Sequence, residues 1–169
     1  MAEDRQHEAG RSLIIADGVL YGADRQVARW LARRVASYSP TPTVRALGIL
    51  KGGKLVAGVA YEHFNGVHVE AVIAGDGGRW ASRAVLRRIF GYPFGQLGVQ
   101  AITVSVPMSN LASLNLATKL GFQPEALVTF AAHDGGTLVI LKAFRDTCEW
   151  VGGDGQEGRR QGTSGTGSV

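Results

Sequence analysis

The segment Val67–Ala74 contains two side chains that can accept a proton from a substrate. Successive side chains of a β-strand alternate between its two faces, so His68 and Glu70 are predicted to share one face. Imidazole and carboxylate groups are the usual carriers of general acid–base catalysis. Glu70 is the first candidate for a base, directly or through a water, and His68 is the second. Alternatively, His68 and Glu70 merely cover a solvent-facing surface of the sheet. Glu62 and His63 are expected either at such a surface or in a substrate groove.

A glycine-rich turn, Asp76–Ala81, follows this strand and leads into a segment with helical periodicity. Backbone amides at a helix N-terminus bind phosphate groups because they have no partner within the helix. The two glycines supply backbone freedom, and Arg79 and Arg83 supply positive charge for pairing with phosphate. Asp76 opposes such binding unless its carboxylate points away. The alternative is a plain strand-to-helix turn with exposed arginines.

A third motif covers Asn110–Phe122 and follows an apolar strand candidate at 101–106. The side-chain oxygen of Asn110 can cap a helix by accepting from the unpaired amides of its first turn. Lys119 lies in the last turn, and Gly121 can supply the left-handed residue that closes a helix. The motif therefore predicts a helix with both ends defined.

The remaining pattern predicts the strands and helices that must position these residues. An amphipathic helix is expected to begin at a capping Asp24 and to continue to Val35. Asn65-Gly66 predicts a two-residue type I′ hairpin turn, because both residues tolerate positive φ. A second helix is expected from Ala81 to Phe90. The expected strands are 12–16, 45–50, 55–64, 67–74, 101–106, 126–133 and 136–144, with turns at 52–53 and 134–135.

The strand, the Asn-x-x-Ser helix and the Leu-Gly-Phe ending together resemble the last conserved motif of the GCN5-related N-acetyltransferases (GNATs). The spacing is closest to the branch that acetylates the amino termini of ribosomal proteins. Gly78-Arg79-Trp80, the segment Tyr92–Gly98 and Cys148–Trp150 are similar to small GNATs encoded by phages and prophages. The resemblance implies the α+β GNAT fold, a central mixed, mostly antiparallel twisted sheet of six to seven strands flanked by three to four helices.

The resemblance also implies a co-substrate, acetyl-CoA, and no metal. Its pyrophosphate would lie in the glycine-rich turn and its pantetheine along the preceding strand, with Asn110 reaching it from the other side. The turn departs from the family pattern, since Asp76 replaces a Gln or Arg and Arg79 replaces a glycine. The implied cofactor-binding residues are Val72, Ile73, Ala74, Gly77, Gly78, Arg79, Trp80, Ala81, Ser82, Arg83, Asn110 and Ser113.

The implied reaction is direct transfer of the acetyl group to a primary amine, with Glu70 as base. Several GNAT branches place a tyrosine acid four residues before the last glycine, where this chain has Ala117. Ser105, Ser109 or Ser113 are candidates to hydrogen-bond near the sulfur, or the thiolate leaves without a dedicated acid. The catalytic candidates are therefore Glu70, His68 and Ser105.

The acceptor stays open at this point: a protein N-terminus, a small amine or a modified nucleobase. One alternative is a phage-type acyltransferase that modifies a nucleobase or another nucleic-acid amine. Another is a GNAT-fold binding module without activity. A homodimer is possible, because GNATs often pair through their terminal strands.

Composition limits the class of protein. A chain of 169 residues, 45% of them apolar, predicts one domain with a proper core, at 12–151. A flexible arm is expected at 1–11, and a disordered tail at 152–169, which has seven glycines. The net charge of +4 suits an anionic ligand, nucleic acid or an acidic protein.

Cysteine content and hydropathy exclude further classes. The single cysteine, Cys148, excludes an intrachain disulfide and a cysteine-cluster metal site. No apolar run approaches the roughly 20 residues that cross a bilayer, and the N-terminus lacks a signal-peptide core. We therefore expect a cytoplasmic protein that does not bind membranes.

Overall fold

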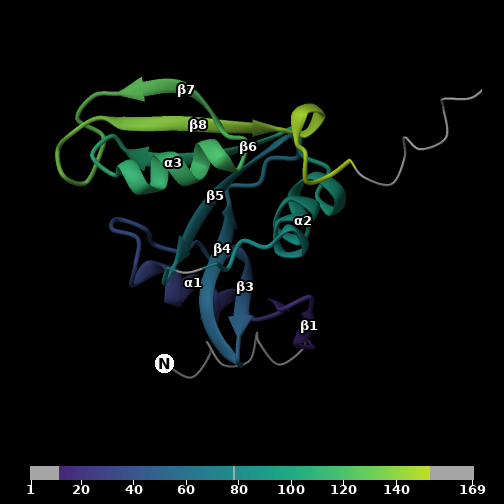
Figure 1. Ribbon diagram of the computed structural model, residues 1–169. Coiled ribbons are helices and arrows are strands. Elements are labelled where there is room, and N and C mark those ends of the chain that lie inside the picture. The colour runs from purple at the N-terminus through teal and green to yellow at the C-terminus, as the bar shows by residue number, and fades with distance from the viewer. Residues whose placement is uncertain (1–11, 78, 153–169) are drawn as a thin grey trace, which may run out of the picture.

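A computed structural model describes residues 12–77 and 79–152 (Figure 1). The expected arm at 1–11, the tail from 153 onward and Gly78 lie outside the described residues. In the described part of the chain, one sheet of eight strands has the order β1-β2-β3-β4-β5-β6-β8-β7. The elements are β1 (Ile14–Ala16), β2 (Val19–Tyr21), α1 (Asp24–Ala32), β3 (Arg45–Lys51), β4 (Lys54–Glu62), β5 (His68–Gly75), α2 (Arg83–Gly91), the π-helix η2 (Tyr92–Gln96), β6 (Ala101–Pro107), α3 (Leu111–Lys119), β7 (Gln123–Val128), β8 (Leu138–Phe144) and the 3-10 turn η3 (Arg145–Thr147).

The sheet is antiparallel except for β5 and β6, which run parallel. A parallel pair needs a crossover, and α2 with η2 provides it. The predicted mixed, mostly antiparallel sheet flanked by three to four helices is thus confirmed, with eight strands in the described residues instead of the predicted six to seven. Among the described residues, no helix has the length and apolar character needed to cross a membrane.

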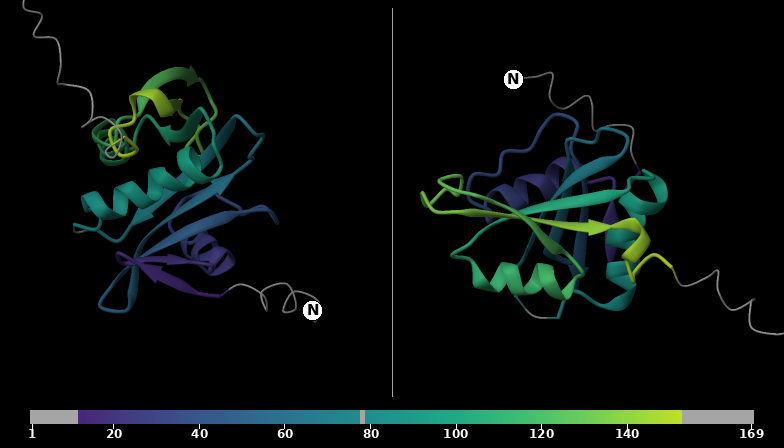
Figure 2. Two further views of the ribbon diagram at one scale, coloured as in Figure 1. Left: turned by 90° about the vertical axis from the view of Figure 1, so that its right-hand side faces the viewer. Right: turned by 90° about the horizontal axis from the view of Figure 1, so that it is seen from above.

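The two faces of the sheet have separate hydrophobic cores. Figure 2 shows the helices that cover these faces. On one face Val27 and Leu31 of α1 are fully buried against β3 and β4. On the other face the larger core joins Phe90 of α2 to Phe94 of η2 and to Phe122 after α3. The helices therefore cover opposite faces of the sheet, with α1 on one face and α2, η2 and α3 on the other.

The eighth strand comes from a hairpin that the sequence pattern did not predict. Asp17 and Gly18 both have positive φ, 52° and 78°, and join β1 to β2 with Ala16 opposite Val19. This is the geometry of a two-residue type I′ turn. β2 has only three residues, too few to show alternation. The first strand also begins later than predicted, at Ile14.

The predicted type I′ turn at Asn65-Gly66 is wrong. β4 ends at Glu62 and β5 begins at His68, so the connection has five residues. Positive φ occurs at His63 (51°) and Gly66 (89°), not at Asn65. The side-chain oxygen of Asn65 instead accepts the backbone N–H groups of Val67 and His68, at 3.0 and 2.8 Å. An Asn side chain that replaces a backbone partner in this way forms an Asx turn.

The ends of α1 also differ from the prediction. Asp24 is the first helical residue, whereas the cap position is occupied by Ala23 without a side-chain hydrogen bond. The Asp24 carboxylate accepts the backbone N–H of Ala46 at 2.7 Å and so ties the helix start to β3. The helix ends at Ala32, before Val35.

The other differences are shifts of element boundaries. α2 begins at Arg83 rather than Ala81, because Ser82 caps it by accepting from the Val85 N–H at 3.3 Å. β7 covers Gln123–Val128, earlier than the predicted 126–133. The turn at 134–135 is confirmed, since Gly135 has a φ of 80° and donates its N–H to the Ala132 carbonyl.

Candidate active site

The central strands β5 and β6 separate after a short paired stretch. They pair over three residues of each strand, ending with Glu70 opposite Thr103. Beyond this point β5 continues along β4 to Gly75, while β6 continues along β8 to Pro107. Within the described residues the two strands therefore form a V with its apex at Glu70 and Thr103 (Figure 1).

The β5 side of the V has an open backbone edge. Asp76 donates its N–H to Val56 of β4 at 2.8 Å. Amides two residues apart in a strand point the same way, so those of Val72 and Ala74 also face β4. The backbone N–H and C=O of Ile73 therefore face the V, where the part of the chain that the structure describes pairs no strand with them. Of the predicted edge Val72–Ala74, Ile73 is the residue that can hydrogen-bond an extended ligand.

The glycine-rich turn lies at the open end of β5. Gly77 has a φ of 81°, which favours glycine. Trp80 is only 7% exposed, and a Cβ on Gly75 would lie 2.4 Å from its indole nitrogen. The Trp80 ring is thus a core group that packs against β5 and holds the turn there. Ala81 is half-buried against the core, while Arg79, Ser82 and Arg83 are exposed.

The carboxylate of Asp76 is engaged by Arg34. The Arg34 Nε and Nη2 donate to the two oxygens of Asp76 at 2.6 and 2.9 Å, a bidentate pair. The same guanidinium lies 3.6 Å from the centre of the Trp30 ring. The hydrogen bond from Arg34 lowers the pKa of Asp76, so this carboxylate is ionised and paired. Arg34 therefore offsets the negative charge that made Asp76 unfavourable beside a phosphate.

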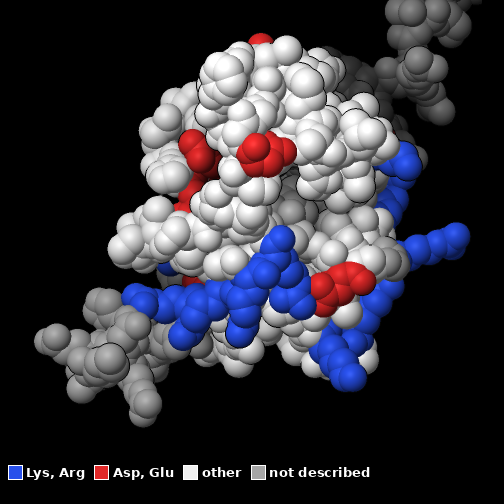
Figure 3. All heavy atoms as spheres, turned by 90° about the vertical axis from the view of Figure 1, so that its left-hand side faces the viewer, with Lys and Arg blue, Asp and Glu red and all other residues white. Residues whose placement is uncertain are grey.

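Positive charge is concentrated near the mouth of the V. Figure 3 shows a band of Lys and Arg at the height of α1, below the lobe built from β6, β7, β8 and α3. Arg29, Arg33 and Arg34, in α1 and directly after it, are exposed. Lys51, in β3, donates to the backbone carbonyl of Arg79 and so holds the glycine-rich turn. The mouth is suited to an anionic ligand.

The β6–α3 motif has the predicted local structure. The Asn110 side chain caps α3 by accepting from the Ser113 N–H at 3.1 Å, and Gly121 has a φ of 96°. Ala117, which replaces the family's tyrosine, is buried in the core. Ser109 donates its hydroxyl to Asp134 at 2.6 Å and is thereby engaged away from the apex.

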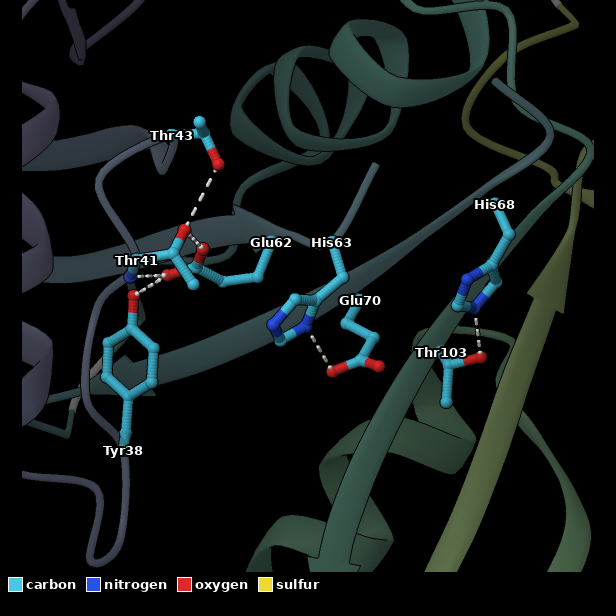
Figure 4. A network of polar contacts seen from close by, with 8 residues as sticks. All are labelled: Tyr38, Thr41, Thr43, Glu62, His63, His68, Glu70 and Thr103. Carbon is cyan, nitrogen blue, oxygen red and sulfur yellow. Dashed lines mark hydrogen bonds and ion pairs between the residues drawn. The ribbon is translucent and has the colours of Figure 1, made fainter. Parts of the chain in front are cut away.

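Glu70, the first candidate base, is half-exposed at the apex. Its carboxylate lies 3.1 Å from the Nδ1 of His63, which has a left-handed φ of 51° (Figure 4). The structure thus brings Glu70 together with a histidine that the sequence pattern placed at the surface or in a groove. His63 is itself exposed, which agrees both with a surface residue and with a residue that lines a substrate groove.

His68, the second candidate, bonds across the V apex. Its Nε2 lies 2.6 Å from the hydroxyl of Thr103, a residue that is 8% exposed (Figure 4). Burial and the nearby Lys142 lower the pKa of His68, against the opposing effect of Glu70 and Glu125. Sequence reasoning missed Thr103, because 35 residues separate it from His68. Ser105 lies two residues further along β6, exposed and on the same face.

Glu62 was expected either at the sheet surface or in a substrate groove, and its burial shows that the surface position is wrong. It is 4% exposed and lies opposite Glu70 in the β4–β5 pairing. Its carboxylate accepts from the Tyr38 hydroxyl at 2.8 Å and from the Thr41 N–H and hydroxyl at 3.2 and 2.5 Å (Figure 4). Burial and this bond to Glu62 raise the pKa of Tyr38. Glu62 therefore anchors the segment after α1 to the end of β4, and no local sequence signal reveals this role.

Comparison with known proteins gives structural neighbours only. No family model and no curated protein matches the chain. The spermidine N-acetyltransferase of Vibrio cholerae, in a dodecameric structure, aligns with a TM-score of 0.60 and 16% identity over 80% of this chain and 94% of that one. A structure described as a probable acetyltransferase aligns with a TM-score of 0.56 and 16% identity over 72% of this chain and 69% of that one.

The chain has the GNAT fold. Mutant forms of the spermidine/spermine N-acetyltransferase SpeG from Vibrio cholerae support the same fold, with a TM-score of 0.55 and 15% identity over 72% of this chain and 76% of that one. Sequence identities of 15–16% show a shared fold but do not show a shared activity. In the GNAT fold, the V between β5 and β6 is where the sequence resemblance predicts the pantetheine, and the turn before α2 is where it predicts the pyrophosphate.

Proposed function

We propose that the protein is an N-acetyltransferase that transfers an acetyl group from acetyl-CoA directly to a primary amine. The observation that carries this proposal is the separation of β5 and β6, which leaves the Ile73 backbone open beside a glycine-rich turn. An open strand edge can hydrogen-bond the amides of pantetheine as another strand would. The fold of the neighbouring acetyltransferases supports the same reading.

The residues around the V fit this co-substrate. The amides at the start of α2, with Gly77, Gly78, Arg79 and Arg83, would bind the pyrophosphate. The backbone of Trp80, Ala81 and Ser82 would complete that turn. Val72 and Ala74 flank the Ile73 edge on β5, and Asn110 and Ser113 would approach from α3. The pairing of Asp76 with Arg34 supports the fit, because it leaves no unpaired carboxylate in the turn.

The acetyl group would lie at the apex of the V. There the amine nitrogen attacks the thioester carbonyl, the C–S bond breaks, and the amine loses a proton. Glu70 is half-exposed beside the apex and is the first candidate to accept this proton, directly or through a water. His68 is the second candidate.

The acceptor is proposed to be a small amine, which the naming of two neighbours as spermidine or spermidine/spermine acetyltransferases supports. A second candidate is a nucleic-acid amine, which the band of Lys and Arg at the mouth of the V favours (Figure 3). The homodimer, the resemblance to phage-encoded members and the cytoplasmic location remain predictions.

Calorimetric titration with acetyl-CoA and with CoA tests the proposal. We expect a Kd on the order of micromolar for the wild type. Arg79→Glu should weaken binding by about 10- to 100-fold, as expected for loss of a charged hydrogen bond. Arg145→Glu, a matched charge reversal on the exposed η3 turn, should bind as the wild type does.

An acceptor panel follows, with thiol release from acetyl-CoA as the readout. Its members are spermidine, a peptide with a free N-terminus and a DNA oligonucleotide carrying an alkylamine. Turnover with one class identifies the acceptor. Absence of CoA binding by the wild type contradicts the acetyltransferase, and binding without turnover supports a GNAT-fold binding module.

A further inference from the structure

We propose that His68 and Thr103 form a proton relay that carries the proton of the attacking amine to the departing sulfur of CoA. The inference rests on the proposed function and assigns the acid that the sequence leaves open. It makes His68, the second of the two candidate bases, the proton acceptor in place of Glu70, and it makes Thr103 the group that protonates the thiolate.

The two side chains meet at the point where the reacting atoms would lie. Thr103 is the last residue of β6 paired with β5, so its hydroxyl lies at the apex of the V. The 2.6 Å distance from the His68 Nε2 to this hydroxyl is short for a hydrogen bond to nitrogen (Figure 4). Because Thr103 is buried, bulk water competes little for its hydroxyl.

The second ring nitrogen of His68 is available to the amine. The bond to Thr103 uses Nε2, and in the described residues the structure records no hydrogen bond to Nδ1. If Nε2 carries the proton and donates to the Thr103 oxygen, Nδ1 has a free lone pair. The Thr103 hydroxyl then has its own proton to donate toward the V.

The surroundings of His68, burial first among them, favour on balance the neutral ring that this role requires. Burial and Lys142 of β8 lower its pKa, while Glu70 on β5 and Glu125 on β7 act in the opposite direction. Lys142 is itself paired with Glu125 at 2.8 Å, so the opposite effects of these two charges on the pKa of His68 partly cancel. With its pKa below the ordinary value of about 6.5, His68 is neutral at pH 7 and can accept a proton.

The proton transfers balance. The amine nitrogen forms the new C–N bond and gives one proton to the His68 Nδ1. The Nε2 proton of His68 moves to the Thr103 oxygen as the Thr103 hydroxyl proton moves to the sulfur, whose C–S bond breaks with the electron pair. The products are the amide and the CoA thiol. His68 ends as the other neutral tautomer, and Thr103 is unchanged.

The other hydroxyl candidates suit this role less well. Ala117 has no acidic group and is buried, and Ser109 is bonded to Asp134. Ser105 lies beyond the paired stretch, on the part of β6 that has left β5. Thr103 combines a position at the apex with a bonded histidine.

Substitution of Thr103 in the full chain tests the relay. Thr103→Val keeps the shape of the side chain and removes the hydroxyl, and we expect a kcat about 100-fold lower with the panel amine that the wild type acetylates. The Kd for CoA and the KM for acetyl-CoA should change less than about threefold, because binding involves other residues. Thr103→Ser should restore most of kcat, and Thr118→Val, an exposed control in α3, should leave it unchanged.

Nitrogen-15 NMR of His68 gives a second readout that needs no substrate. At neutral pH we expect the Nε2–H tautomer in the wild type and in Thr103→Ser, and a mixture of tautomers in Thr103→Val. Full kcat in a folded Thr103→Val variant, or an Nδ1–H tautomer in the wild type, overturns the relay. Either result leaves the acetyltransferase standing, whereas failure of the wild type to bind CoA removes the acetyltransferase itself.

Discussion

Replacement of Glu62 by glutamine should destabilise the protein although it barely changes the shape of the side chain. The Glu62 carboxylate receives three hydrogen bonds, from the Tyr38 hydroxyl and from the N–H and hydroxyl of Thr41. A glutamine can keep its oxygen toward the two donors that share Oε1, but it turns an NH₂ group toward the Thr41 hydroxyl. That hydroxyl must then rotate, with Thr43 at 3.3 Å as its other partner.

The magnitude follows from the loss of charge at these bonds. Hydrogen bonds to charged groups contribute about 1.5–3 kcal/mol each, and neutral ones about 0.5–1.5. Over three bonds the loss is roughly 3 kcal/mol. Relief from burying a charge, and from repulsion by Glu70 directly opposite, offsets about 1 kcal/mol of it. We therefore expect the free energy of unfolding to fall by about 2 kcal/mol, and Tm by about 6–8 °C.

Urea and thermal unfolding at pH 7 measure this change. Tyr38→Phe is the matched comparison, because it removes one of the three donors and should cost about 1.5–3 kcal/mol, the contribution of one hydrogen bond to a charged group. In the double variant the two effects should be less than additive, since both act on one carboxylate. If Glu62→Gln is within 0.5 kcal/mol of the wild type, the buried carboxylate does not anchor the segment after α1.

Two further predictions concern stability. Because the pKa of His68 is lowered on folding, protonation favours the unfolded chain. The wild type should therefore lose stability relative to His68→Gln as the pH falls from about 6.5, which urea unfolding between pH 7.5 and pH 5 measures; parallel pH profiles would contradict the lowered pKa. Separately, a Cβ on Gly58 would lie 2.9 Å from a methyl of the fully buried Val27, so Gly58→Ala should cost about 1–3 kcal/mol by overpacking α1. Gly95→Ala, with nothing within 4 Å, is the neutral control, and equal Tm values for the two variants would refute the close packing.

Much of the fold and part of the candidate site could be predicted from local sequence patterns. The Asn110 cap, the left-handed Gly121 and the alternation that puts His68 and Glu70 on one face depend on residues only a few positions apart. Local patterns gave wrong predictions where a side chain bonds to a different partner from the one that the pattern indicates. Asp24 bonds to Ala46 instead of capping α1, and Asn65 forms an Asx turn instead of a type I′ turn.

The sequence by itself determined which residues carry chemistry and which local elements hold them, because propensity, periodicity and capping act over a few residues. Only the tertiary structure decided their partners. Arg34 reaches Asp76 across 42 residues because α1 packs against β3, β4 and the neighbouring β5. Thr103 reaches His68 across 35 residues because the crossover through α2 makes β5 and β6 parallel neighbours. No periodicity encodes which strand edges meet or where they separate. The V at the centre of the proposed function is therefore a property of the assembled sheet.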